Sequence, residues 1–376
     1  MRIIAFAMLL LAAGPASAFE STGNAVADAF LRSAEQAGFA DARAGSVSRD
    51  GGTTVVADVA AGRPGEGRTL TVAVVRMDGA LVNADNQIVA DTIIYEDVKI
   101  TDEAGRPASS IGSLTLSDAR LGGDGEDGVT GLVGDFRTIV VNDVTARSDA
   151  GQEVRLARFD AELADQNGVS GADITVEDLV FDLSLFEEPT ANSLRDLGYD
   201  GLAVDLTAAG EWEAASGRAV LSGSSLSVDG MGTLSLEAGA SGLTSQTYDT
   251  LRTGNLDFAS LLNALGSVSL SGVTLRFTDA GLTDRLLDRF GEQAGLSREA
   301  ISTRILAALS QPLGLVGDPA FSEKVVGAAR SFLADPSTLT VRAMPNEAIS
   351  ALQVVGAAML NPRLLPSLLA LEVTYQ

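Results

Sequence analysis

The chain of 376 residues contains no cysteine and no histidine. Without cysteine it has no disulfides and no thiol nucleophile, and without histidine it has no Ser–His–Asp triad and no histidine metal site. Lysine is nearly absent, because Lys99 and Lys324 are the only two and neither lies in a catalytic motif. Trp212 is the single tryptophan and is predicted to be half-buried on a strand. These absences predict a protein that is not an enzyme.

Basic residues are also scarce. The chain has 26 Lys and Arg against 50 Asp and Glu, which gives a net charge of −24. Such a surface repels nucleic acid and anionic headgroups, so we expect no nucleic-acid partner. It suits cations or basic partners, and adaptation to a salty habitat explains it equally well. Apolar residues make up 46% of the chain, enough to form a core, so disorder is not expected.

The N-terminus has the layout of a secretory signal peptide. Arg2 precedes an apolar run at residues 3–13 that is too short to span a bilayer. Residues 14–15 break the run, and the small residues 16–18 fit a cleavage site that leaves Phe19 first. A retained anchor is the alternative. We therefore expect export to the periplasm, or secretion, with no transmembrane segment in the mature chain.

One short pattern recurs along the chain, with apolar residues at offsets 0, 2, 5 and 7 and a small or acidic residue at offset 4. Five segments follow it: Ile93, Tyr95, Val98 and Ile100; Leu114, Leu116, Ala119 and Leu121; Ile139, Val141, Val144 and Ala146; Ile174, Val176, Leu179 and Phe181; Val268, Leu270, Val273 and Leu275. In a straight strand the odd step would send the two pairs to opposite faces. One extra residue, a β-bulge, would put all four on one face.

Helical and strand patterns occupy different parts of the chain. A helix is predicted near residues 24–36, and strands with turns continue to about residue 242. Helices are then predicted at 255–265, 279–290, 297–309, 318–332 and 349–359, before a terminal strand at 369–375. The expected fold is α+β: a long, curved, mainly antiparallel bulged sheet with an N-terminal helix and a C-terminal helical cap. We place domains at 19–250 and 251–376, the second with four amphipathic helices packing on the sheet.

A bent sheet with one apolar face presents a concave surface that helices, a ligand or another chain must cover. We expect a lipid or acyl chain, or an envelope partner, to occupy it. The residues predicted to line it are Leu114, Leu116, Ile139, Val141, Ile174, Val176, Leu179 and Phe181. The alternative is that these are ordinary core residues.

An acidic segment at residues 122–130 matches one copy of the calcium repeat G-G-x-G-x-D-x-U-x. Its carboxylates Asp124, Glu126 and Asp127 are candidate calcium ligands, since hard cations prefer oxygen. Such repeats bind calcium between stacked turns, and a single copy is also typical of an exposed acidic hairpin loop. A calcium-dependent binding or adhesion module is therefore an alternative function, and no other cofactor is expected.

Acidic residues also recur at the pattern breaks. A carboxylate-based hydrolase would need a pair of the four aspartates Asp97, Asp118, Asp143 and Asp178. The competing interpretation is that aspartate at a bulge bonds the local backbone. The fifth copy has Gly272 at this position, which favours the backbone role.

The last segment with the recurring pattern, together with the residues that follow it, resembles a known protein family. Residues 268–277 (VSLSGVTLRF) followed by 278–282 (TDAGL) and amphipathic helices resemble the AsmA/TamB-like envelope proteins. The resemblance implies a β-rich exported protein with an apolar groove, involved in envelope maintenance without a catalytic centre. Residues 332–341 (FLADPSTLTV) are also similar to uncharacterised exported proteins of alphaproteobacteria. Unlike AsmA and TamB, this chain has no predicted membrane anchor after cleavage.

Overall fold

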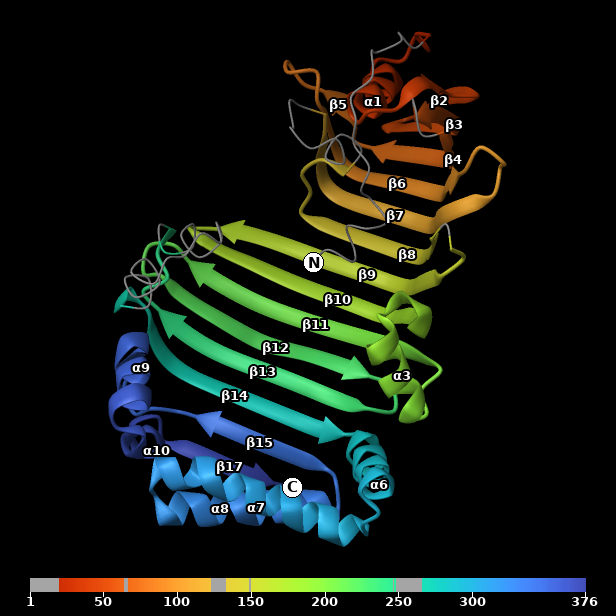
Figure 1. Ribbon diagram of the computed structural model, residues 1–376. Helices are drawn as coiled ribbons and strands as arrows, with labels where there is room; N and C mark the ends of the chain where they lie inside the picture. The colour runs from red at the N-terminus through yellow and green to blue at the C-terminus, as the bar shows by residue number, and fades with distance from the viewer. Residues whose placement is uncertain (1–19, 64–66, 123–132, 149, 246, 248–265) are drawn as a thin grey trace. The chain divides into compact units, whose positions relative to one another are not determined.

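The computed structural model describes residues 20–63, 67–122, 133–148, 150–245, 247 and 266–376 (Figure 1). The predicted signal peptide, the candidate calcium ligands Asp124, Glu126 and Asp127, and the helix predicted at 255–265 lie outside these residues. Within the described part of the chain, seventeen strands form one open antiparallel sheet, with a helix near its N-terminus and several helices in its C-terminal part. The predicted α+β fold is confirmed.

The chain divides into two compact units. The first contains the described residues up to Leu163 together with Thr175–Leu185. Its elements are α1 (Ala25–Gln36), β1 (Ala40–Arg43), β2 (Ser46–Asp50), β3 (Thr53–Arg63), β4 (Arg68–Asp78), β5 (Leu81–Val82), β6 (Ile88–Thr101), β7 (Pro107–Leu121), β8 (Thr138–Arg147) and most of β9 (Glu153–Gln166) and β10 (Val169–Asp182). Strands β3, β4, β6, β7, β8 and β9 pair in that order as an antiparallel meander.

Helix α1 begins and ends where its sequence predicts. The side chain of Asn24 caps the first turn by accepting hydrogen bonds from the backbone N–H groups of Val26 and Ala27. Phe30 and Leu31 are buried. The Phe30 ring lies 6.0 Å from that of Tyr95 on β6, so the apolar stripe of the helix packs onto the sheet.

The apolar quartets of the first unit share one face, as predicted. In each of β3, β4, β6, β7, β8 and β9 one residue has no partner in the strand pairing, although the residues on both sides of it are paired. These unpaired positions lie next to one another across the sheet, and we call them the bulge row: Asp58, Ala73, Asp97, Gly112, Asp143 and Ala157. Side chains three positions apart across the row, such as Val72 and Val75 on β4, are both buried. Because every strand contributes its own extra residue, the register continues unchanged on both sides of the row.

The second unit contains residues 164–174 and all described residues from Phe186 onward. Its further elements are α3 (Glu188–Asp196), β11 (Gly201–Glu213), β12 (Arg218–Val228), β13 (Gly232–Ser241), β14 (Ser269–Asp279), α6 (Leu282–Ala294), α7 (Arg298–Val316), α8 (Pro319–Ala334), β15 (Thr338–Ala343), β16 (Ile349–Ser350), α9 (Ala351–Leu360), η3 (Pro362–Leu364), α10 (Leu365–Leu368) and β17 (Leu371–Tyr375). Strands β11, β12, β13, β14, β15 and β17 pair in that order, and β12 to β14 curve along their length (Figure 1).

The predicted boundary near residue 250 needs correction. Strands β13 and β14 lie on either side of it and pair from Gly232 opposite Asp279 to Ser241 opposite Ser269, so one unit spans it. The change from strands to helices along the sequence is a change of element within that unit. The division falls instead in the β9–β10 hairpin, whose tip belongs with β11.

The four C-terminal helices predicted between residues 279 and 359 are present as α6, α7, α8 and α9. They do not all pack on the sheet in the same way. Helix α8 contacts β15 and β17, and α9 contacts β16, whereas α7 packs mainly against its neighbouring helices α6 and α8. None of the described helices is long and apolar enough to cross a membrane.

Candidate functional site

The structure brings together four of the eight residues predicted to line a ligand face. Leu114 of β7 lies opposite Val141 of β8, and Leu116 lies opposite Ile139. Val176 is buried as well, while Leu179 and Phe181 are half-buried in the same unit. Ile174 is half-buried and lies two residues before Val176 on β10, at the point where the second unit begins.

The four clustered residues continue directly into the core beneath α1. Tyr95 lies opposite Leu114, and Ile93 lies opposite Leu116. All these side chains are at least nine-tenths buried, and burial raises the pKa of Tyr95. The concave face expected at these positions is therefore a filled core in the structure. Ligand contact there remains an untested prediction.

The second unit instead presents an apolar face to solvent. Leu226 of β12 lies opposite Leu234 of β13, and one pair further along Leu236 lies opposite Leu275, which in turn lies opposite Val341. These five side chains remain 36–42% exposed. We call this set the leucine face: Leu226, Leu234, Leu236, Leu275 and Val341. Its strands β12 to β15 place no charged side chain on this side except Asp279 at one end.

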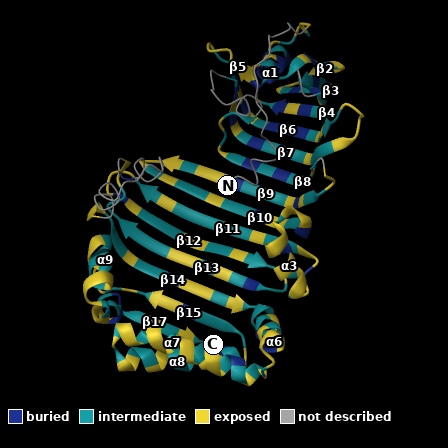
Figure 2. Ribbon diagram, in the orientation of Figure 1, coloured by how far each residue is buried: buried dark blue, intermediate teal, exposed yellow. Residues whose placement is uncertain are grey.

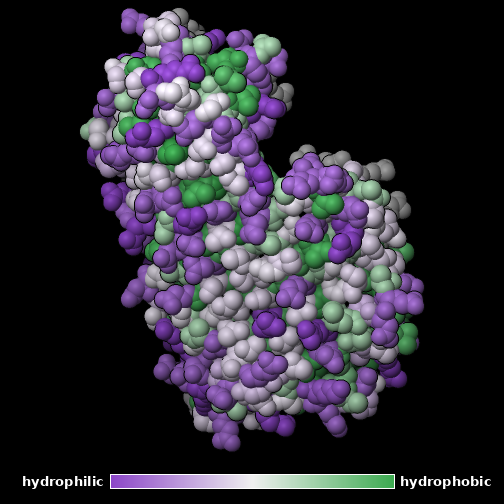
Figure 3. Space-filling view, turned by 180° about the vertical axis from the view of Figure 1, so that it is seen from behind, coloured by the Kyte–Doolittle hydropathy of each residue, from purple (hydrophilic) through white to green (hydrophobic). Residues whose placement is uncertain are grey.

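The opposite side of the same strands is polar. Ser225, Ser235 and Arg276 lie side by side across β12, β13 and β14. Neighbouring hydroxyls bond across the strands, as Thr233 does to Ser227 at 3.0 Å. Figure 3 views the molecule from behind and shows mainly white and purple atoms over this unit, with scattered green. The two faces therefore differ sharply in polarity, which makes the exposure of the leucine face unusual.

Helices bound the leucine face along its β17 side. Phe332 of α8 is buried, and its ring lies 6.1 Å from that of Phe277 on β14. Phe277 is on the same side of its strand as Leu275. In Figure 2 the strands from β12 to β15 beyond this helix are mostly coloured intermediate or exposed, and few of their residues are buried. Helix α8 therefore covers one margin of the face and leaves the leucine rows accessible.

Trp212 lies on the same side of the sheet. It faces Ala219 of β12, which faces Ala240 of β13, and Ala240 lies opposite Leu270 of β14. Its indole N–H donates a hydrogen bond of 2.6 Å to the carbonyl of Leu243. The prediction of a half-buried tryptophan on a strand is confirmed. Its position makes it a built-in fluorescence reporter for this face.

The leucine face was not among the surfaces predicted from the sequence. Its strongest signal was present in β13, where Leu234 and Leu236 alternate with Thr233 and Ser235. A weaker quartet was also visible at residues 221–228. Alternation of this kind shows which side chains share a face, but it does not show whether anything covers that face.

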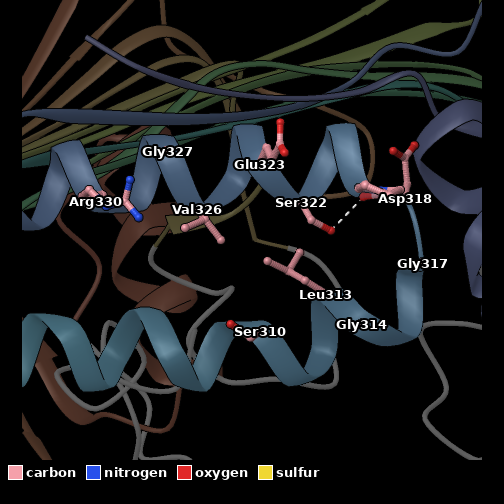
Figure 4. A pocket seen from close by; sticks show the side chains of 11 residues that line it. Ser310, Leu313, Gly314, Gly317, Asp318, Ser322, Glu323, Val326, Gly327 and Arg330 are labelled. Atoms are coloured by element: carbon pink, nitrogen blue, oxygen red, sulfur yellow. Dashed lines mark hydrogen bonds between the residues drawn. The ribbon is translucent and has the colours of Figure 1, made fainter.

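A separate cleft of about 590 Å³ lies between α7 and α8. Figure 4 shows Leu313 and Val326 pointing into the space between the helices, whereas Glu323 points away from it. The Ser322 hydroxyl donates to the carbonyl of Asp318, and the Asp318 side chain caps α8 by accepting from the backbone N–H of Phe321, so both polar groups are engaged within the helix. The cleft thus offers an apolar gap between helices without converging reactive groups.

The four aspartates at the pattern breaks adopt an unusual backbone conformation. Asp97, Asp118, Asp143 and Asp178 have φ between +49° and +59°, a left-handed conformation that aspartate tolerates better than most residues. Asp97 pairs with Lys99, and Asp118 with Arg137, both near the surface. The predicted hydrogen bonds from these aspartates to the local backbone stay a prediction, and their geometry gives the hydrolase hypothesis no support.

The described carboxyl groups with a displaced pKa are Asp28 and Asp102, and both pKa values are lowered. A general acid needs the opposite displacement. No group of three acidic residues suited to a metal occurs in the parts of the chain that the structure describes. The calcium prediction concerns residues outside them and stays a prediction.

The comparisons with known proteins concern mainly the second unit. No curated protein matches the chain. A family model described only as an uncharacterized protein matches residues 225–376. This segment begins inside β12 and includes the whole leucine face together with α6 to α9, but none of the first unit.

Proposed function

We propose that the protein is a non-catalytic envelope protein of the periplasm that holds the acyl chain of a lipid on its leucine face. The observation that carries this proposal is the exposure of five aligned apolar side chains on one side of a sheet whose other side is polar. Each methylene group removed from water contributes about 0.8 kcal/mol, so an elongated chain lying along these rows gains substantial free energy.

The chemistry of the surface favours an apolar ligand. The leucine face has no cationic group to hold a phosphate, and the chain as a whole has a net charge of −24. An acyl chain contributes no charge to be repelled. The signal-peptide pattern and the AsmA/TamB-like segments support an envelope location, and the lack of histidine and cysteine supports a role without catalysis.

Fluorescence of Trp212 tests acyl-chain binding directly. A brominated fatty acid bound along this face should quench the single tryptophan with a saturable dependence on concentration. Leu234→Asp combined with Leu236→Asp should abolish quenching, because two carboxylates would lie in the apolar rows. Ser235→Asp is the matched control: it adds a carboxylate to the same strand on the polar side and should leave quenching intact.

Mass spectrometry of the gently purified protein provides an independent measurement. Co-purified lipid is expected in the wild-type protein and in Ser235→Asp, but not in the double leucine variant. Absence of both quenching and lipid from a folded wild-type protein would refute acyl-chain binding. The leucine face would then be left as a surface for a protein partner.

A further inference from the structure

A second exposed apolar surface lies at α9 and has no part in the leucine face. We call it the α9 patch: Leu315 at the end of α7, Leu352, Met359 and Leu360 of α9, and Leu364 of η3. Leu315 is 72% exposed, Met359 76% and Leu360 88%. Helix α9 has no charged residue and no buried residue, and Figure 2 shows it intermediate to exposed throughout. Packing among the residues that the structure describes does not explain an apolar helix without a buried side.

The members of the α9 patch come from elements that touch. Segment η3 contacts both α9 and the C-terminal part of α7. The Arg363 side chain lies against Gly317, which caps α7: a Cβ on Gly317 would come 2.5 Å from Arg363 Nε. A cation at a helix C-terminus is favourable. This contact places η3, which carries Leu364, beside the end of α7, which carries Leu315.

The charge of the segment is as distinctive as its exposure. From residue 349 to residue 371 the single charged residue is Arg363, although the chain as a whole carries 50 acidic residues. This stretch therefore lacks the carboxylates that would repel phosphate headgroups. Protruding leucine and methionine side chains around one arginine match the apolar and polar layers of a lipid interface.

We propose that the α9 patch docks the protein onto the surface of a phospholipid bilayer. Leu352, Met359 and Leu360 enter the boundary between headgroups and acyl chains, and Arg363 meets the phosphates. A second copy of the chain is a poorer occupant, because a stable interface takes about 20–30 residues from each partner and the patch offers five protruding side chains. This docking does not depend on acyl-chain binding at the leucine face.

Vesicle flotation tests the proposal with the full chain. The wild-type protein should float with phosphatidylcholine vesicles, and Met359→Asp combined with Leu360→Asp should reduce the bound fraction about tenfold or more, because the carboxylates oppose insertion. Leu81→Asp is the matched control. Leu81 is 67% exposed but belongs to β5 of the first unit, so this variant should float like the wild type.

The net charge adds a second expectation. Phosphatidylglycerol in the vesicles should weaken flotation at low salt, and added salt should restore it, because the repulsion between the acidic chain and an anionic surface is screened. Failure of the wild type to float, or equal flotation of the double variant, would overturn the proposal. So would a dimer in sedimentation velocity that the double variant converts to monomer, because the patch would then be a contact between copies. Retained quenching of Trp212 in the double variant separates this test from acyl-chain binding.

Discussion

Residues of the bulge row lie so close that their side chains constrain one another. Asp143 adopts φ +57°, and Gly112 faces it from the neighbouring strand. A Cβ on Gly112 would come 2.9 Å from the Cβ of Asp143, closer than such atoms approach without displacement. A side chain at position 112 would therefore require Asp143 to shift.

This contact predicts a measurable coupling. Gly112→Ala should lower the free energy of unfolding by about 1–3 kcal/mol through overpacking. Asp143→Gly should change stability little, since glycine also accepts positive φ. In the Asp143→Gly background the alanine should cost at least about 1 kcal/mol less than alone. Strictly additive effects in urea denaturation would contradict the proposed contact.

Asp28 predicts a pH dependence at the start of α1. Burial raises the pKa of its carboxyl, but hydrogen bonds from Ser21 and Thr22 and the charge of Arg32 together outweigh burial and lower it. A lowered folded pKa adds stability above the unfolded value of about 3.9, and this stability is lost as the pH falls through the folded pKa. Asp28→Asn should therefore destabilise the protein near neutral pH by about 1 kcal/mol.

The difference in unfolding free energy between wild type and Asp28→Asn should shrink as the pH falls below about 4. Chemical denaturation across this range measures it. Asp97→Asn is a suitable control, because Asp97 pairs only with the exposed Lys99 and has no part in α1. A difference that persists unchanged in acid would show that the Asp28 carboxylate is not the stabilising group.

Among the elements, helix α8 packs on the sheet next to β15 and β17. Phe332 is 9% exposed and packs against Phe277, whereas Phe290 of α6 is 48% exposed. Phe332→Ala should lower the unfolding free energy by about 3–5 kcal/mol through the cavity it leaves. Phe290→Ala should have a much smaller effect. Urea denaturation followed by Trp212 fluorescence reports on the same unit, and equal losses in both variants would argue against this packing.

The helices and bulged strands were predictable because their signals are local. Asn24 and Asp318 cap helices where the sequence places them, and the odd apolar steps of β6 and β8 mark the skipped residues Asp97 and Asp143. The boundary between the two units was not predictable, because the pairing of β13 with β14 joins segments separated by more than twenty residues. The sequence also does not show whether an apolar face is covered by other residues. Leu116 and Leu236 both alternate with polar residues, yet one is fully buried and the other is 36% exposed.

At the scale of the whole molecule, charge of one sign opposes folding. The net charge is −24, while ion pairs such as Arg76 with Glu96 join groups that are both nearly half exposed. Exposed pairs of this kind contribute little, so loss of self-repulsion dominates the response to salt. Raising sodium chloride, which shortens the screening length from about 30 Å at 0.01 M to about 3 Å at 1 M, should raise Tm. A fall in Tm would show that ion pairs outweigh the repulsion.

Calcium separates screening from site binding in the same experiment. Screening depends on ionic strength and valence, so calcium and magnesium chloride at equal concentration should raise Tm by the same amount. A bound ion adds RT ln(1 + [L]/Kd), which grows with calcium and not with magnesium if the acidic segment at residues 122–130 selects the larger ion. Asp124→Asn combined with Asp127→Asn should remove any such excess and leave the sodium chloride response unchanged. Equal responses to the two metals would leave the acidity of this segment as part of the general negative charge, with no calcium-dependent role.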